Sequence, residues 1–142
     1  MRKGPKMNLM RIRLVLARTP DFPVGSHEHG YEFVAPITSD DLIDAAAWKT
    51  VKEQCRVVRF CGDEPEREGL LRHVGHGWRF DYDKNDDEDD EPFFKLDKHR
   101  LRPGTYVSVT ENDGVLRPFR IESILPVVTR VRGAFIPSTA VP

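Results

Sequence analysis

His27 and His29 are the residues whose types and spacing point most directly to chemistry. In an extended segment, residues i and i+2 point to the same side, so both imidazoles can reach one divalent metal ion. Candidates for a third ligand are His73, His76, His99 and Asp21. The competing interpretation is a solvated, hydrogen-bonded loop. A metal-binding protein, or a metal-dependent enzyme with His27 and His29 as ligands, is therefore one alternative.

A second pattern is a set of arginines that alternate with apolar residues on predicted strands. They are Arg11, Arg13, Arg56, Arg59, Arg72, Arg79, Arg117 and Arg120. A basic face with aromatic neighbours can bind single-stranded nucleic acid, so a weak nucleic-acid-binding barrel is a further alternative. However, the formal net charge is only -1, whereas nucleic-acid binders usually carry a basic excess. A solvated, ion-paired sheet surface is the favoured interpretation, and nucleic acid is not the expected partner.

The aromatic residues of segment 78–83 alternate with charged ones, since Trp78, Phe80 and Tyr82 share one face while Arg79 and Asp81 share the other. We expect this segment and the histidine loop to form the surface that meets a ligand or partner. The predicted surface residues are Tyr31, Trp78, Tyr82, Arg79 and Arg120.

Motifs that would define an enzyme are missing from the sequence. There is no glycine-rich phosphate loop, nucleophile elbow, CxxC pair or HExxH motif. Segment 19–30 nevertheless holds two prolines and two histidines, which is unusual for a simple connection. The main hypothesis is a small, non-enzymatic cytoplasmic module for binding or regulation. Its partner would be a protein or a small molecule, and its only suggested cofactor is a divalent metal.

Composition indicates a well-solvated single domain. The chain has 142 residues, of which 39% are hydrophobic and 32% charged. No stretch approaches the roughly 20 apolar residues of a membrane span, and no small-residue cleavage site follows the basic N-terminal segment. Cys55 and Cys61 would lie about 20 Å apart on a strand, too far for a disulfide. Free thiols suit a reducing cytoplasm.

The clearest structural pattern is a hairpin in segment 104–126, with Asp113 and Gly114 at its turn. Segment 40–54 is predicted to be a helix, because Thr38 and Ser39 can cap it and apolar residues then recur at helical spacing. With about seven strands, the sequence favours a mainly β or α+β fold: a small antiparallel, partly closed barrel or sheet with one capping helix.

The predicted domain covers residues 11–131 and includes an acidic loop at 83–91. Residues 1–10 are expected to be a flexible N-terminal extension, and residues 132–142 a C-terminal tail.

Two resemblances accompany these patterns. RPGTYVSV followed by RPFRIESI resembles the flavin-binding barrel of the ferredoxin-reductase family, although Phe119 and Arg120 stand where that family has its tyrosine and its Ser/Thr. More of the chain resembles a family of short bacterial proteins that have no assigned activity. That likeness rests on TPDFPVGSHEHGYEFVAPI, RFCGDE, GWRFDYD and the hairpin. It implies a single compact unit and brings no catalytic residue with it.

Overall fold

The computed structural model describes residues 8–75, 77–82, 91–94, 100–111 and 113–127. These residues form eight strands, one short helix and one 3-10 turn. In chain order the elements are β1 (Leu9–Leu16), β2 (Ser26–Pro36), α1 (Ala45–Val51), η1 (Lys52–Gln54), β3 (Arg56–Cys61), β4 (Arg67–Val74), β5 (Gly77–Asp81), β6 (Glu91–Phe94), β7 (Tyr106–Thr110) and β8 (Leu116–Pro126).

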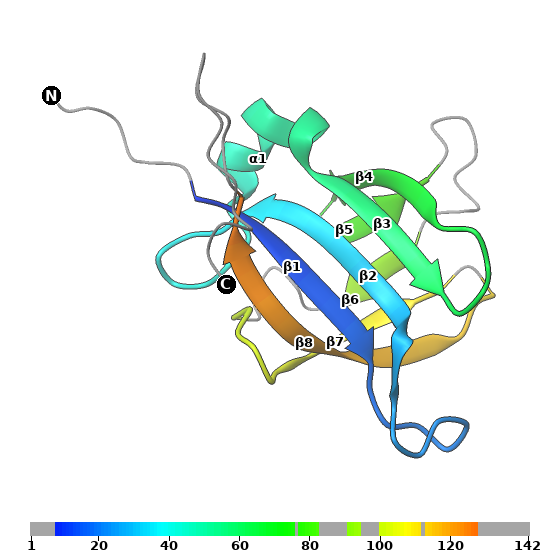
Figure 1. The fold of residues 1–142 in the computed structure, drawn as a ribbon. Helices are drawn as coiled ribbons and strands as arrows, with labels where there is room; N and C mark the ends of the chain where they lie inside the picture. Colours follow the sequence, from blue (N-terminus) through cyan, green and yellow to red (C-terminus); the bar gives the residue numbers. More distant parts are fainter. Residues whose placement is uncertain (1–7, 76, 83–90, 95–99, 112, 128–142) are drawn as a thin grey trace, which may run out of the picture.

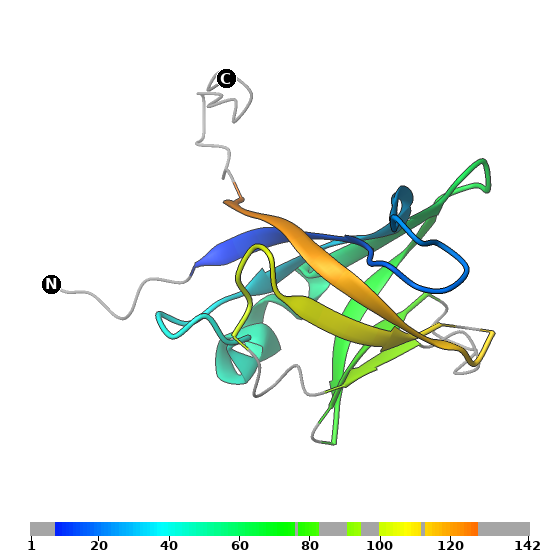
Figure 2. The same cartoon turned by 90° about the horizontal axis from the view of Figure 1, so that it is seen from below.

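The strands form a closed antiparallel barrel in which each strand pairs with the next and β8 pairs with β1 (Figures 1 and 2). The prediction of a small antiparallel barrel with one helix is confirmed. The barrel is closed rather than partly closed, and the described residues supply eight strands rather than about seven. An eight-stranded barrel is just wide enough for side chains to fill its interior.

The interior is filled by the alternate residues that the sequence pattern indicates. Tyr31 and Phe33 of β2 are fully or almost fully buried, as are Phe80 of β5 and Phe119 of β8. The ring of Tyr31 stacks on Phe80 at 4.9 Å and meets Phe119 edge-on at 5.1 Å. Such aromatic pairs stabilise a core beyond the area they bury. The barrel is therefore a packed core and not a channel.

The helix is shorter than predicted and begins later. Asp44 is its N-cap, with its carboxylate accepting a hydrogen bond from the Ala47 N–H. Thr38 instead holds a tight turn, because its hydroxyl accepts from the N–H groups of Asp40 and Leu42. The prediction of a helix from residue 40 was therefore wrong at its start. Helix α1 lies against one end of the barrel, which we call the α1 end (Figure 1).

The predicted hairpin is confirmed as β7 and β8, but its turn differs from the expected one. Thr110 pairs with Leu116, and the Gly114 N–H donates to the Glu111 carbonyl. Gly114 has a positive φ, of 83°, but Asp113 does not, whereas the type I′ turn expected of an Asp-Gly pair needs a positive φ at both residues. Glu111 is therefore the first residue of the turn. It lies at the barrel end opposite α1, which we call the Glu111 end.

The predicted domain limits need one change. Strand β1 begins at Leu9, inside the segment expected to be an N-terminal extension. At the other end, the Val127 N–H bonds the Leu9 carbonyl. The acidic loop was predicted to reach residue 91, but Glu91 is the first residue of β6. Residues 83–90 and the tail 132–142 lie outside the described residues.

Candidate functional site

The two histidines of the predicted metal site do not converge. His27 is mostly exposed and bonds Glu122 through Nε2 at 3.0 Å. His29 is buried, and its Nε2 lies 3.0 Å from both carboxylate oxygens of Glu111. The reason is an irregularity in β2: Gly30 pairs with Val15, whereas Ser26 pairs with the adjacent residue of β1. Such a bulge re-aims side chains, so the i, i+2 rule fails here.

The other proposed ligands do not complete a metal site. His73 lies in β4 at the α1 end, stacked on Trp78 at 4.2 Å. His76 and His99 lie outside the described residues. In the described part of the chain, no group of three or more His, Cys, Asp and Glu side chains is arranged to hold a metal ion.

A buried charge network occupies the Glu111 end of the barrel. The Glu111 carboxylate, 1% exposed, accepts hydrogen bonds from His29 Nε2 and the Tyr31 hydroxyl. Arg59 donates to it from Nε and Nη2, both at 3.3 Å, and Arg117 from Nη1 at 2.9 Å. These four donors come from β2, β3 and β8. Together they hold one carboxylate that the barrel has removed from water.

The network keeps Glu111 ionised. Burial alone raises the pKa of a carboxyl group, but here the hydrogen bonds from His29 and Tyr31, with the charges of His29 and Arg59, lower the pKa of Glu111 to about 2. Such a group cannot exchange protons near neutral pH, as a general acid or base must. The arrangement orients His29 and neutralises two arginines. It is suited to stability rather than to proton transfer.

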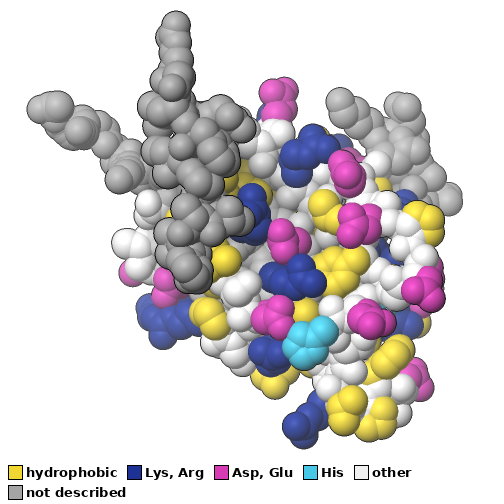
Figure 3. All heavy atoms as spheres, in the orientation of Figure 1, with side chains coloured by type: hydrophobic (Ala, Val, Ile, Leu, Met, Phe, Trp, Pro, Cys, Tyr) yellow, Lys and Arg dark blue, Asp and Glu magenta, His cyan; other side chains and the backbone are white. Residues whose placement is uncertain are grey.

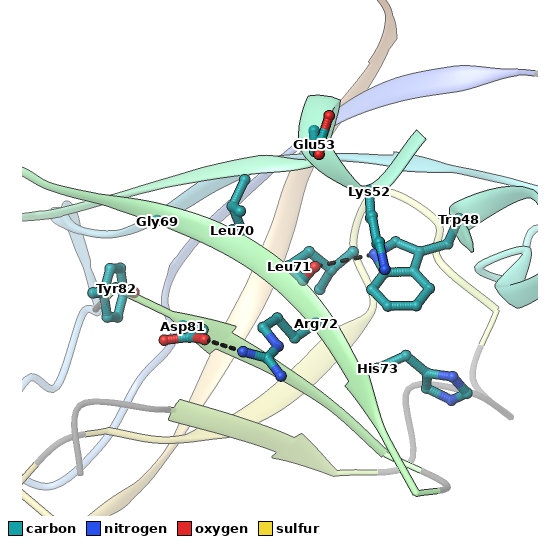
Figure 4. A pocket seen from close by; sticks show the side chains of 10 residues that line it. All are labelled: Trp48, Lys52, Glu53, Gly69, Leu70, Leu71, Arg72, His73, Asp81 and Tyr82. Atoms are coloured by element: carbon teal, nitrogen blue, oxygen red, sulfur yellow. Dashed lines mark hydrogen bonds and ion pairs between the residues drawn. The ribbon is translucent and has the colours of Figure 1, made fainter. Parts of the chain in front are cut away.

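A cleft of about 570 Å³ runs along β4 beside α1 and η1 (Figure 4). We call it the β4 cleft. Its lining residues are Trp48, Lys52, Glu53, Gly69, Leu70, Leu71, Arg72, His73, Asp81 and Tyr82. Small-molecule sites usually measure about 300–1,000 Å³ and combine aromatic walls with a few polar groups. The β4 cleft meets both criteria.

The walls of the β4 cleft are fixed by specific contacts. Trp48 donates from Nε1 to the Leu71 carbonyl at 3.0 Å, and the Lys52 ammonium lies 5.7 Å from the centre of the Trp48 ring. Arg72 Nη1 donates to Asp81 at 2.7 Å. Figure 4 shows the Trp48–Leu71 and Arg72–Asp81 hydrogen bonds as dashed lines. The Arg72 side chain stays 47% exposed, so further guanidinium donors face solvent.

The cleft also borders an uncovered stretch of strand edge. Strand β3 pairs with β4 only as far as Leu70, so no described strand pairs with β4 beyond that point on this side. The Leu71 N–H bonds the Cys55 carbonyl, and its own carbonyl is used by Trp48. Backbone groups of successive strand residues point to alternate edges, which directs the N–H and C=O of His73 toward the same side as those of Leu71. An amide group of a ligand can pair there.

Of the residues predicted to form the ligand surface, some are buried and others line clefts. Tyr31 and Trp78 are 0% and 1% exposed, so their assignment to a surface was wrong: both face the barrel interior. Tyr82 lines the β4 cleft, with the Arg67 guanidinium 4.6 Å from the centre of its ring. Arg79 is half-buried on β5, and Arg120 lines a different cleft, near His27.

Most of the arginine pattern is accounted for by ion pairs. Arg11 and Arg13 both reach Glu32, and Arg56 reaches Glu68. On the face that carries β1 and β2, basic and acidic side chains are interleaved (Figure 3). A surface of this kind offers little excess charge to a phosphate backbone.

Comparison of the chain with protein-family models, with curated proteins and with solved structures found no match. Among the described residues, no helix is long and apolar enough to cross a membrane. Inferences about function therefore depend on the geometry of the clefts and of the charge network.

Sequence reasoning missed both the charge network and the β4 cleft. Glu111 stands in a turn-like ENDG segment, and nothing local marks it as buried. For the cleft the sequence holds one indication: Trp48 flanks the apolar stripe of the helix, four residues before Lys52. A large aromatic side chain at that position is expected to pack against a neighbouring element. That element is the edge of β4, whose position depends on closure of the barrel.

Proposed function

We propose that the protein is a small, non-enzymatic binding module, and that its ligand occupies the β4 cleft. The ligand is a small organic molecule with a planar apolar part and an acidic group. The protein acts in the cytoplasm, where its two free thiols would remain reduced.

One observation carries this proposal: two cationic side chains and an aromatic wall meet around a single opening of ligand size. The Trp48 side chain, of a residue 9% exposed, lines the opening, and His73 lies beside it with ring centroids 6.0 Å apart. The same opening is lined by two cations, Lys52 and Arg72, and by two carboxylates, Glu53 and Asp81, of which Asp81 is already paired with Arg72 at 2.7 Å. Lys52 and the Arg72 donors that this pair leaves exposed supply the positive charge that an acid would meet. A planar acid uses both features, because its ring contacts the wall while its carboxylate accepts charge-assisted hydrogen bonds.

The titratable groups that the structure describes support a binding role over an enzymatic one. Among the described carboxylates, Glu111 has its pKa lowered to about 2, so it stays ionised, and it is surrounded by its own donors. Burial raises the pKa of Cys55 to about 11 and also raises the pKa of Cys61, so neither thiol is activated as a nucleophile.

Tryptophan fluorescence tests the proposal directly. Both tryptophans of the chain, Trp48 and Trp78, lie in contact at the α1 end with ring centroids 5.6 Å apart. We expect saturable changes in emission when phenylacetate is titrated into the protein, and weaker ones with the uncharged analogue benzyl alcohol. Emission that stays unchanged across a panel of aromatic carboxylates would contradict the proposal.

A charge reversal locates the binding site. Lys52→Glu should weaken phenylacetate binding about fivefold, because a unit charge some 8 Å away contributes roughly 0.5 kcal/mol in water and the reversal doubles it. Lys49→Glu is the matched control, since Lys49 is an exposed residue of the same helix that does not line the β4 cleft. Equal losses in the two variants would point to a general charge effect and against this cleft.

A further inference from the structure

A second cleft, of about 370 Å³, lies on the outside of the barrel where the connection between β1 and β2 meets β7 and β8. We call it the arginine cleft. It is lined by Val15, Leu16, Ala17, Arg18, Val24, Gly25, Ser26, His27, Tyr106 and Arg120. No described residue lines both the arginine cleft and the β4 cleft, so the two clefts are separate.

Two arginines in this cleft have no carboxylate partner in the regions that the structure describes. Among the described residues, seven arginines bond a carboxylate: Arg11, Arg13, Arg56, Arg59, Arg72, Arg102 and Arg117. Arg18 and Arg120 have no such partner in the described part of the chain. The acidic residue two positions from Arg120 is Glu122, and its carboxylate is already shared by Arg13 and His27. No acidic residue lines the arginine cleft.

The remaining groups of the cleft suit an oxyanion that carries an organic part. The Ser26 hydroxyl oxygen accepts a hydrogen bond from the Glu28 N–H, so its own O–H stays available as a donor. Tyr106 pairs across the strands with Arg120 and is 55% exposed. Tyr106 therefore adds a half-exposed aromatic ring to the lining that Arg18 and Arg120 share. Arginine is well suited to phosphate because its planar fork can donate two parallel hydrogen bonds.

We propose that the arginine cleft binds a small phosphate monoester, with Arg18 and Arg120 holding the phosphate and Tyr106 contacting the organic group. The proposal does not depend on the function assigned to the β4 cleft. It also gives a role to two arginines that, unlike the seven named above, have no carboxylate partner among the described residues. A bound dianion would replace those partners.

Calorimetric titration at constant ionic strength tests this proposal, with inorganic phosphate and phenyl phosphate as probes. We expect saturable binding of both, with millimolar dissociation constants for inorganic phosphate and tighter binding of phenyl phosphate. Constant ionic strength matters because exposed charges are screened over about 10 Å at 0.1 M salt. The absence of saturable binding to the wild-type protein would overturn the proposal. Tighter binding of inorganic phosphate than of phenyl phosphate would overturn the role given to Tyr106.

Variants separate this site from general charge attraction. The double variant Arg18→Gln/Arg120→Gln should lose the binding, and circular dichroism checks that it folds. Arg56→Gln is the matched control, because Arg56 is an exposed arginine of the barrel paired with Glu68. Phenyl phosphate is also a planar acid of the kind proposed for the β4 cleft, so the loss is measured with inorganic phosphate, which has no ring to contact the wall of that cleft. A folded double variant that binds as well as Arg56→Gln would refute the assignment.

Discussion

Replacing Glu111 with glutamine should destabilise the protein by about 3 kcal/mol at pH 7. The carboxyl group has a pKa of about 2 in the folded chain against its usual 4.5. Each tenfold change in proton affinity is worth 1.36 kcal/mol, so a difference of about 2.5 in pKa corresponds to about 3 kcal/mol. Glutamine keeps the shape but leaves the Arg59 and Arg117 side chains, 11% and 23% exposed, without this counter-charge. Breaking a buried pair typically costs 3–5 kcal/mol.

The same reasoning fixes the pH dependence of this contribution. Because the pKa of Glu111 is lower in the folded state, the unfolded chain binds more protons between about pH 4.5 and pH 2. The stabilisation is therefore fully present above about pH 5 and is lost as the pH falls toward 2. The difference in unfolding free energy between wild type and Glu111→Gln should shrink over that range.

Urea denaturation followed by tryptophan emission measures both effects. Glu32→Gln is the matched control, because Glu32 also forms ion pairs with two arginines but its side chain is 36% exposed. Exposed pairs of this kind contribute about 0–1 kcal/mol. A loss of less than about 1 kcal/mol in Glu111→Gln, no larger than that of the control, would refute this reasoning. So would a difference from wild type that stays constant between about pH 6 and pH 3.

Two other predictions concern packing and thiol accessibility. Gly30→Ala should destabilise the barrel by at least about 2 kcal/mol in urea unfolding, since its Cβ would lie 1.9 Å from the Leu14 carbonyl oxygen. Gly77→Ala, whose Cβ would have no neighbour closer than 3.9 Å, should cost less than about 1 kcal/mol, and equal losses would contradict the contact. In native buffer at pH 8, iodoacetamide should modify half-buried Cys61 slowly and buried Cys55 only after unfolding, because burial raises the pKa of both thiols. Peptide mass spectrometry can measure both rates. Labelling of Cys55 at the rate of the unfolded chain would disprove its burial.

The barrel was predictable from the sequence because its physical cause is local. A closed sheet needs one dry face and one wet face on every strand, so alternation along β5 and β8 is visible without knowing their neighbours. The helix start was harder to predict. Thr38 and Asp44 are both residues that commonly cap a helix, so the sequence does not show which of them precedes it. In the structure, the β-bridge between Ile37 and Ile43 keeps the chain non-helical up to Ile43, and the helix follows Asp44.

The sites were much less predictable, because they depend on strand pairing. Tyr31 and Glu111 are 80 positions apart, and only closure of the barrel brings the hydroxyl to the carboxylate. The bulge that separates His27 from His29 likewise depends on the pairing of β2 with β1. Alternation identified Arg120 as an outward-facing residue. It did not show that Arg120 lacks a carboxylate partner.

The charge network has a further consequence for the fold. A buried ion cluster stabilises a protein no more than well-packed apolar residues would, so its presence at the Glu111 end needs another reason. Its donors come from three strands, and a slip of β2, β3 or β8 by one residue would turn donors to the outer face. Such a slip would leave charge buried without a partner, which costs more than a misplaced methyl group. We infer that the network penalises incorrect barrel closure. The polar groups suited to ligands, in the β4 cleft and the arginine cleft, then lie on a frame whose register is already fixed.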